Sequence, residues 1–254
     1  MKNVKRKLID GEATFGTWQM IGNTSISEIL CDAGYEWVTI DMEHTGIDVT
    51  DALELIRVID LCGKVPAVRV SANDETIIKR VLDCGARIII VPMVMDANDA
   101  IKAVDAVYYP PKGRRGVGLS RAQGYGFKFE EYKSKQDKLV VVAQIEHIEA
   151  INNLDKILEV EGIDATIIGP YDLSGSLGTP GEFDTDKFKQ AIERYEDLSR
   201  VHKKPMGYHI VKPSKEEVEE HIDKGYQFVA LGFDSYFLGE RAREVNSGML
   251  ECKV

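Results

Sequence analysis

The chain has 254 residues, of which 44% are hydrophobic, enough for one large core and within the usual length of single α/β barrels. Its formal net charge is −10, from 32 basic and 42 acidic side chains, and without a Lys/Arg cluster it is not expected to bind a nucleic-acid backbone. The charged N-terminus has no apolar signal-peptide segment. No apolar run approaches the roughly 20 residues that span a bilayer, so we expect no membrane segment.

Cysteine usage points to a reducing compartment. The four cysteines, Cys31, Cys62, Cys84 and Cys252, form no CxxC pair. Free thiols in this arrangement are typical of a reduced protein. We therefore predict a cytoplasmic protein without disulfides.

Eight short runs rich in β-branched residues recur along the chain. They cover residues 14–20, 37–42, 65–70, 86–94, 139–146, 165–173, 205–210 and 228–234. The runs are nearly continuous in apolar residues, which is typical of strands buried on both faces of a parallel sheet.

The segments between these runs carry helix start and stop signals. Capping boxes are predicted at Ser25-x-x-Glu28 and Ser214-x-x-Glu217, single caps at Asp48, at Asn73 or Asp74 and at Asp96, and helix ends at Gly34, Gly63 and Gly85. Eight strands alternating with helices predict an α/β fold of the (β/α)₈ barrel type, with an open doubly wound sheet as the alternative. No linker is visible, so we expect one domain over residues 1–254.

Polar residues gather where the predicted strands end. Such residues are Asp41, Glu43 and His44 at the end of the second strand, Arg69 in the third, Gln144 and Glu146 in the fifth, Tyr171 and Asp172 in the sixth, His209 in the seventh and Asp234 at the end of the eighth. The active sites of barrels of this type lie at the carboxyl ends of the strands. This asymmetry predicts an enzyme.

Glu146 and Asp172 each close a strongly apolar run. A carboxylate in such a place is costly unless it is paired or bound to a metal. Two carboxylates from adjacent strands, completed by water and a substrate oxygen, suit Mg²⁺ or Mn²⁺. Ordinary salt bridges at strand ends are the alternative.

Arg69 and His44 are the remaining candidates for chemistry. A buried Arg69 needs an anionic partner, either a structural carboxylate such as Asp41 or a substrate carboxylate or oxyanion. His44 is the natural proton carrier near neutral pH. His147 and His209 are weaker candidates, and Asp48 is better explained as a helix cap.

The stretch 108–126 is long, glycine-rich and basic, with Arg114, Arg115 and Arg121. It lacks the GxxxxGK[ST] pattern of a phosphate-binding loop. A lid that guides an anionic substrate and a contact between subunits are both compatible with it. Lys212 lies beyond a strand and precedes Pro213, so a Schiff-base mechanism is not favoured.

Taken together, these motifs resemble the HpcH/HpaI aldolase family of metal-dependent pyruvate aldolases. The similar stretches run from about residue 13 to 235 and include AGYEWVTIDMEHTGID, VPAVRVSAND, YYPPKGRRGVG, VVAQIEHIEA and IIGPYDLSGSLGTPGEF. The resemblance implies a (β/α)₈ barrel that reversibly cleaves a 4-hydroxy-2-oxo acid to pyruvate and an aldehyde. The reaction would pass through a pyruvate enolate stabilised by a divalent cation, Mg²⁺, Mn²⁺ or Co²⁺.

The resemblance also implies roles for individual residues. Glu146 and Asp172 would bind the metal, His44 would transfer protons, Arg69 would stabilise charge at the keto oxygen, and Gln144 with the backbone at Tyr171 would contact pyruvate. Asp83 matches a position linked to a more basic histidine. Because Asp83 precedes the fourth strand, it belongs at the wrong end of the barrel for direct contact, so a fold detail or a neighbouring subunit would be needed.

Two departures from the family pattern concern Tyr171, where a small residue is common, and His147, where Ser or Thr is common. These departures bear on the identity of the aldehyde substrate more than on the reaction class. The low aromatic content expected at the rim suggests a small polar aldehyde. Family members tend to form hexamers, or trimer-based assemblies, in which a terminal helix is exchanged, and residues 235–254 are the matching segment. A lyase acting on acyl-CoA thioesters and a non-catalytic barrel are the alternatives.

Overall fold

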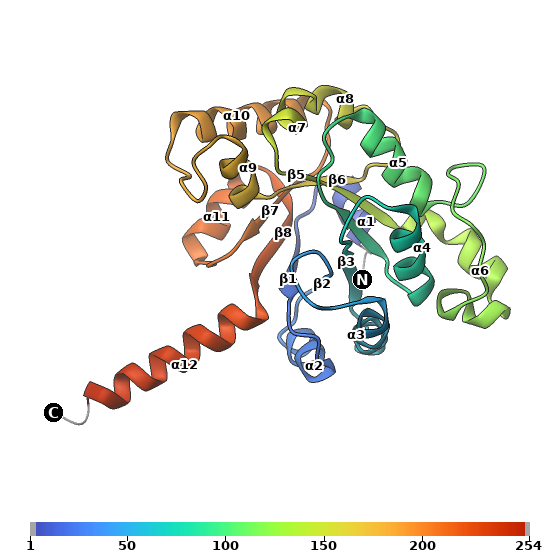
Figure 1. Ribbon diagram of the computed structural model, residues 1–254, viewed down its shortest axis with the longest axis horizontal. Coiled ribbons are helices and arrows are strands. Elements are labelled where there is room, and N and C mark those ends of the chain that lie inside the picture. The colour runs from blue at the N-terminus through green and yellow to red at the C-terminus, as the bar shows by residue number, and fades with distance from the viewer. Residues whose placement is uncertain (1–3, 252–254) are drawn as a thin grey trace.

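The computed structural model describes residues 4–251, with side chains up to residue 248, and forms a closed barrel of eight parallel strands (Figure 1). The strands are β1 (Thr14–Gln19), β2 (Trp37–Asp41), β3 (Val65–Arg69), β4 (Ile88–Val91), β5 (Val140–Ile145), β6 (Ala165–Ile168), β7 (Met206–Ile210) and β8 (Tyr226–Phe233). Each strand pairs with the next, and β8 pairs with β1. The predicted (β/α)₈ barrel is confirmed, and the open sheet is excluded.

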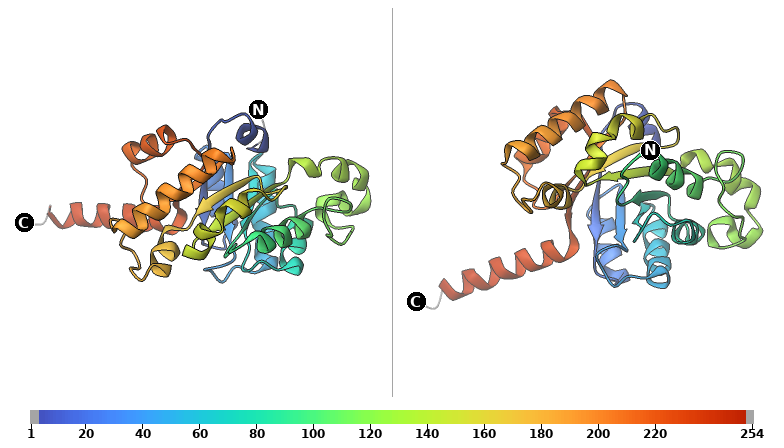
Figure 2. Two further views of the ribbon diagram at one scale, coloured as in Figure 1. Left: turned by 90° about the horizontal axis from the view of Figure 1, so that it is seen from above. Right: turned by 45° about the horizontal axis from the view of Figure 1, so that its top comes forward.

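Twelve helices accompany the described strands, and most of them cover the outside of the barrel (Figures 1 and 2). They are α1 (Val4–Ile9), α2 (Thr24–Asp32), α3 (Val49–Leu61), α4 (Glu75–Cys84), α5 (Ala97–Val107), α6 (Phe129–Ser134), α7 (Ile148–Asn152), α8 (Leu154–Leu158), α9 (Pro170–Ser176), α10 (Asp186–Val201), α11 (Lys215–Asp223) and α12 (Asp234–Glu251). Two 3₁₀ turns, Arg121–Gly126 and Gln136–Lys138, lie between α5 and β5. None of the helices in the described part of the chain is long and apolar enough to cross a membrane.

Most predicted caps are present. The side chains of Asp48, Asp74, Asp96 and Ser214 accept hydrogen bonds from the first turns of their helices, and Asp48 forms a capping box with Asp51. The prediction for the second helix was wrong, because it begins one residue before Ser25 and the side chain of Asn23 caps it.

The barrel interior is filled by side chains. Trp37 and Phe228 stack inside it with ring centroids 4.2 Å apart. Gly16 makes this possible, because a Cβ atom there would lie 2.0 Å from the Trp37 ring. Helix α1 then closes the amino end of the barrel: Val4 and Leu8 join the interior cluster, so the carboxyl end is the open one.

Helix α12 differs from the others, because it contacts β1 and β8 near its start and then projects away from the barrel (Figures 1 and 2). Leu238 and Val245 on this helix are mostly exposed, at 63% and 52%.

Cys31, Cys62 and Cys84 are free thiols, as predicted, whereas Cys252 lies outside the described residues.

Candidate active site

A cavity of about 470 Å³ opens at the carboxyl ends of the strands. Its walls come from β1, β2, β3, β5, β6, β7 and β8 and from α9, and they include Trp18, Met20, Asp41, His44, Arg69, Gln144, Tyr171, Asp172, His209, Val211 and Phe233. Sites for small molecules typically measure roughly 300–1,000 Å³. Five of the predicted site residues, His44, Arg69, Gln144, Tyr171 and Asp172, therefore line one cavity of suitable size.

The register of β2 and β3 places Asp41 directly beside Arg69. The guanidinium donates from Nε to Oδ1 of Asp41 at 2.9 Å and from Nη2 to Oδ2 at 2.6 Å. Asp41 is fully buried and the Arg69 side chain is 13% exposed, so each charge compensates the other. The structural partner considered for Arg69 is thus present, while the guanidinium also lines the cavity.

The segment after β2 is organised by the same carboxylate. Oδ1 of Asp41 accepts from the backbone N–H groups of Glu43 and His44. Glu43 Oε2 lies 3.2 Å from Nη1 of Arg69 and 3.8 Å from Nε2 of His44. Burial raises the pKa of Glu43 to about 7, against the opposing effect of Arg69. The His44 side chain is 56% exposed, so it stands at the mouth of the cavity rather than inside the barrel.

Glu146 follows β5 and is buried. Its Oε1 accepts from the backbone N–H of Met93 at 2.6 Å, and its Oε2 accepts from the amide of Gln144. Burial raises the pKa of this carboxyl group, and the nearby charge of Asp172 raises it further. Met93 takes a φ of +52°, a strained value for a residue other than glycine, and this turn aims its N–H at Glu146.

Asp172 and Tyr171 belong to the first turn of α9, not to a strand. The predicted strand over 165–173 was too long: β6 ends at Ile168, and Pro170 opens the helix, where its fixed φ and missing N–H are tolerated. The correction leaves both residues on the cavity wall. Asp172 is exposed, in contrast to Glu146.

Gly169 separates β6 from α9 and touches the acidic group. A Cβ atom there would lie 2.9 Å from both Cβ and Oε2 of Glu146. The backbone has φ −97°, which alanine accepts, so the restriction is purely steric.

We expect Gly169→Ala to displace the Glu146 carboxylate and to lower kcat/KM about ten- to a hundredfold, because a displacement near 1 Å has effects of this size. Gly175→Ala within α9 is the control, since its Cβ would meet nothing closer than 4.0 Å. Turnover and metal affinity of the two variants should be compared. Equal activity would show that the contact with Gly169 does not position Glu146.

Trp18 and His209 form a part of the site that sequence reasoning largely missed. Their ring centroids are 4.6 Å apart and the rings are stacked. The Arg69 guanidinium lies over the Trp18 ring, with its Cζ 5.4 Å from the ring centroid. His209 Nε2 lies 3.0 Å from the carbonyl oxygen of Gly232, and burial lowers the pKa of His209 to about 4. A neutral His209 is therefore a packing partner of Trp18 and no proton carrier near pH 7. Alternation along β7 was the only signal that it faces inward.

Asp83 lies elsewhere. It lies in the last turn of α4 at the amino end of the barrel, where its carboxylate accepts from the fully buried guanidinium of Arg115 and from Gln123. Within this chain it is not brought to His44, as its place before β4 implied.

The basic stretch 108–126 also lies at that end, because it connects α5 to β5. The prediction that it forms a lid over its own barrel was therefore wrong. Arg114, Arg115 and Arg121 pair with Asp105, Asp83 and Asp60 respectively. The alternative, a contact between subunits, stays a prediction.

The remaining histidine near the site has a structural role. Nδ1 of His147 accepts from the N–H of Glu149 and caps α7.

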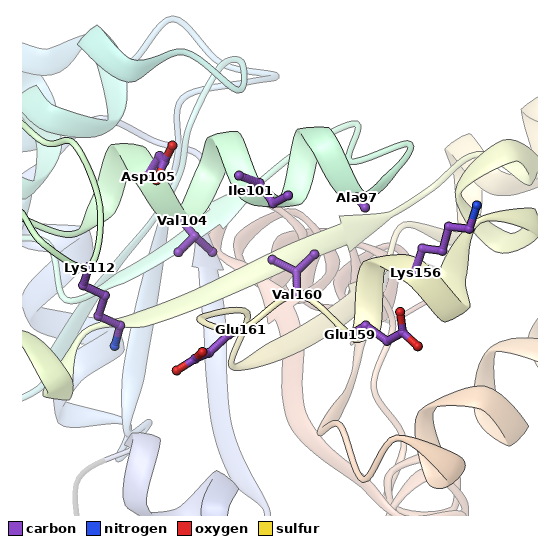
Figure 3. A pocket seen from close by; sticks show the side chains of 9 residues that line it. All are labelled: Ala97, Ile101, Val104, Asp105, Lys112, Lys156, Glu159, Val160 and Glu161. Carbon is purple, nitrogen blue, oxygen red and sulfur yellow. The ribbon is translucent and has the colours of Figure 1, made fainter.

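A larger hollow of about 750 Å³ lies outside the barrel, between α5 and the α8–β6 connection (Figure 3). Ile101, Val104 and Val160 form its floor, and charged side chains of both signs stand at its rim. Its lining shares no residue with that of the cavity at the strand ends.

The fit of a divalent cation can be judged from the donors. No group of three or more His, Cys, Asp or Glu side chains with metal-binding geometry occurs within residues 4–251. Asp172 lines the cavity, and Glu146 lies buried behind the lining residue Gln144, where burial and the charge of Asp172 both raise its pKa. A buried carboxylate beside a second one favours a cation between them. Oxygen ligands of this number suit a hard cation that keeps water or substrate oxygens as its remaining ligands.

Comparisons with known proteins support an enzymatic role. The chain is 38% identical over 91% of its length to the 2-keto-3-deoxy-L-rhamnonate aldolase of Klebsiella pneumoniae, covering 86% of that protein. It is 37% identical over 94% of its length to the 4-hydroxy-2-oxo-heptane-1,7-dioate aldolase of Shigella sonnei, covering 91% of it.

The fold comparison agrees. A solved HpcH/HpaI aldolase/citrate lyase family protein from Burkholderia cenocepacia matches with a TM-score of 0.92 at 28% identity, covering 97% of this chain and 98% of that one. The family model for HpcH/HpaI aldolase/citrate lyase matches residues 14–239. The chain therefore belongs to the HpcH/HpaI aldolase/citrate lyase family and is an aldolase, a carbon–carbon lyase.

Proposed function

We propose that the chain reversibly cleaves a 4-hydroxy-2-oxo acid to pyruvate and an aldehyde, with Mg²⁺ or Mn²⁺, or else Co²⁺, held by Glu146 and Asp172. The observation that carries the proposal is that Asp172, Arg69 and His44 line one cavity at the strand ends, while Glu146 lies directly behind its lining residue Gln144, close to the charges of Asp172 and Arg69. When bound, the cation polarises the 2-oxo acid as a Lewis acid.

The chain's own residues bind and orient the substrate. The amide of Gln144, held by Glu146, and the backbone at Tyr171 contact the pyruvate half. Breaking the C3–C4 bond moves its electron pair toward the keto oxygen, and Arg69 stabilises the charge that grows there. Asp41 supports this role, because it fixes the guanidinium through two hydrogen bonds.

The proton of the C4 hydroxyl must leave as that bond breaks. His44 receives it, because its exposed imidazole stands at the cavity mouth, and protonation of C3 then completes the pyruvate product.

The structure speaks against a lyase for acyl-CoA thioesters. Such an enzyme needs a basic, open groove for the CoA phosphates beside its active site. The arginines of 108–126 lie at the opposite end of the barrel and are paired with acidic side chains.

We further propose a homo-oligomer, a hexamer or another trimer-based assembly, in which α12 packs on a neighbouring subunit. The projection of α12 from its own barrel supports this, together with its exposed Leu238 and Val245 (Figure 1). A role of Asp83 at the histidine would require such a neighbour.

Pyruvate release tests the main proposal. The protein is incubated with excess Mg²⁺ or Mn²⁺ and a panel of 4-hydroxy-2-oxo acids, and release is coupled to an NADH-consuming reporter. We expect metal-dependent pyruvate formation from at least one member of the panel. No pyruvate from any member, with or without metal, would refute the proposal.

His44→Ala should lower kcat by about a hundred- to ten-thousandfold while leaving metal affinity nearly unchanged. General acid–base catalysis contributes rate factors of this size, and His44 contacts neither of the proposed metal ligands through any hydrogen bond among the described residues. Calorimetric titration with Mn²⁺ beside steady-state rates measures both quantities, with His147→Ala as the matched control. Loss of Mn²⁺ binding in the His44 variant would show that its role is to hold the metal.

A further inference from the structure

The strand order separates two unlike parts of the cavity wall, because β7, β8 and β1 are consecutive around the barrel and lie apart from β3. One part carries the charged groups of the proposed reaction, Asp41, His44, Arg69 and Asp172. The other is lined by apolar side chains from the ends of three strands and from α9, namely Met20, Val211, Phe233, Pro170 and Tyr171. The premise that the rim holds few aromatic residues was therefore wrong.

Positive charge is missing from the apolar part. Among the described residues that line the cavity, Arg69 is the only arginine or lysine, and Asp41 and Glu43 already compensate its charge. His209 adds no charge, because burial lowers its pKa to about 4. A carboxylate, sulfonate or phosphate placed in this part would lose its hydration without gaining a counter-ion.

Two phenylalanine rings outside the cavity lining support the Tyr171 ring of the apolar part. The ring of Tyr171 meets that of Phe183 edge to face, with centroids 5.1 Å apart and planes at 87°. Phe183 in turn packs on Phe188 at 5.3 Å. Although Tyr171 is 52% exposed, this support holds its ring at the mouth, so it offers a substrate a preformed apolar surface.

The cavity of about 470 Å³ is larger than a three-carbon oxo acid needs. Since the charged part takes the pyruvate half, the apolar part is left for the aldehyde half. We infer that the preferred aldehyde is uncharged and apolar, with an alkyl or aryl side chain, rather than one that ends in a carboxylate, sulfonate or phosphate. This inference rests on the proposed function and names the substrate class of the same site.

Aldol addition to pyruvate tests the inference. With excess Mg²⁺ or Mn²⁺, kcat/KM is measured for acetaldehyde, propanal, butanal and pentanal, and for succinic semialdehyde as the charged counterpart of pentanal. We expect kcat/KM to rise about fourfold for each added methylene until the cavity is full. Pentanal should exceed succinic semialdehyde by at least about tenfold. A flat alkyl series, or succinic semialdehyde equal to or better than pentanal, would overturn the inference.

A second measurement distinguishes a failure of this inference from a failure of the proposed function on which it rests. The wild-type protein with metal is incubated with pyruvate alone in D₂O, and loss of the methyl proton signal is followed by NMR. Exchange together with a preference for the charged aldehyde refutes the inference but not the proposed function. Absence of both exchange and addition refutes the proposed function, and the inference falls with it.

Val211→Arg places a cation on the apolar wall. We expect it to shift the ratio of the two kcat/KM values toward succinic semialdehyde by at least about tenfold. Val201→Arg is the matched control, because Val201 ends α10, is 73% exposed and is not among the cavity-lining residues. An unchanged ratio in the Val211 variant would show that this wall does not contact the aldehyde.

Discussion

Glu146→Gln is expected to reduce metal-dependent turnover by about a thousandfold or more. A Lewis-acid metal supplies several kcal/mol of transition-state stabilisation, and each 1.36 kcal/mol is a factor of ten in rate. Glutamine keeps the size of the side chain and can still accept from the N–H of Met93, so the loss reports the missing charge. The measurement pairs kcat over a Mn²⁺ titration with calorimetric Mn²⁺ affinity.

Glu149→Gln provides the matched control for that experiment. Glu149 lies three residues further along the chain, is exposed and is not among the residues that line the cavity. If Glu146→Gln retained full turnover at a saturating metal concentration, Glu146 would have to be removed from the metal site.

Arg69→Met should lower the free energy of unfolding by about 3–5 kcal/mol, because it leaves the fully buried Asp41 carboxylate without its partner. At roughly 2–4 °C per kcal/mol for a chain near this length, the melting temperature should fall by about 10 °C. Thermal and urea unfolding measure the change. Adding Asp41→Asn should restore much of the loss, since the uncompensated charge is then removed.

Arg87→Met separates the effect of burial from that of any Arg–Asp pair. Arg87 and Asp60 form an ion pair at 2.7 Å whose side chains are 43% and 39% exposed, so its removal should cost no more than about 1 kcal/mol. Similar losses in the Arg69 and Arg87 variants would refute the role assigned to burial.

The sequence predicted the strands well, because strands buried on both faces are written as continuous apolar runs. The strand predicted at 165–173 was too long, because the apolar residues of β6 continue without a break into the first turn of α9. The pattern of apolar residues does not mark that boundary, and Pro170 was the available signal.

The site also contains residues that the sequence predicted and residues that it did not. Acidic residues at strand ends were found because a charge next to an apolar run is conspicuous, and their meeting follows from the parallel arrangement. The stack of Trp18 on His209 and the N–H of Met93 depend on side-chain packing and on one positive φ, and neither leaves a composition signal. The apolar wall could not be foreseen either, because Met20, Val211 and Phe233 come from three separate strand ends.

Helix α1 determines from which end of the barrel the substrate can enter and the products can leave. Lys5 ties the helix to the barrel floor through Asp164 at 3.0 Å and the carbonyl of Leu139 at 2.8 Å, and the interior beneath is filled. The amino end of the barrel is therefore closed, and the cavity opens only at the carboxyl end of the strands among the described residues. For the proposed reaction, we therefore expect the substrate and both products to pass through the carboxyl end alone.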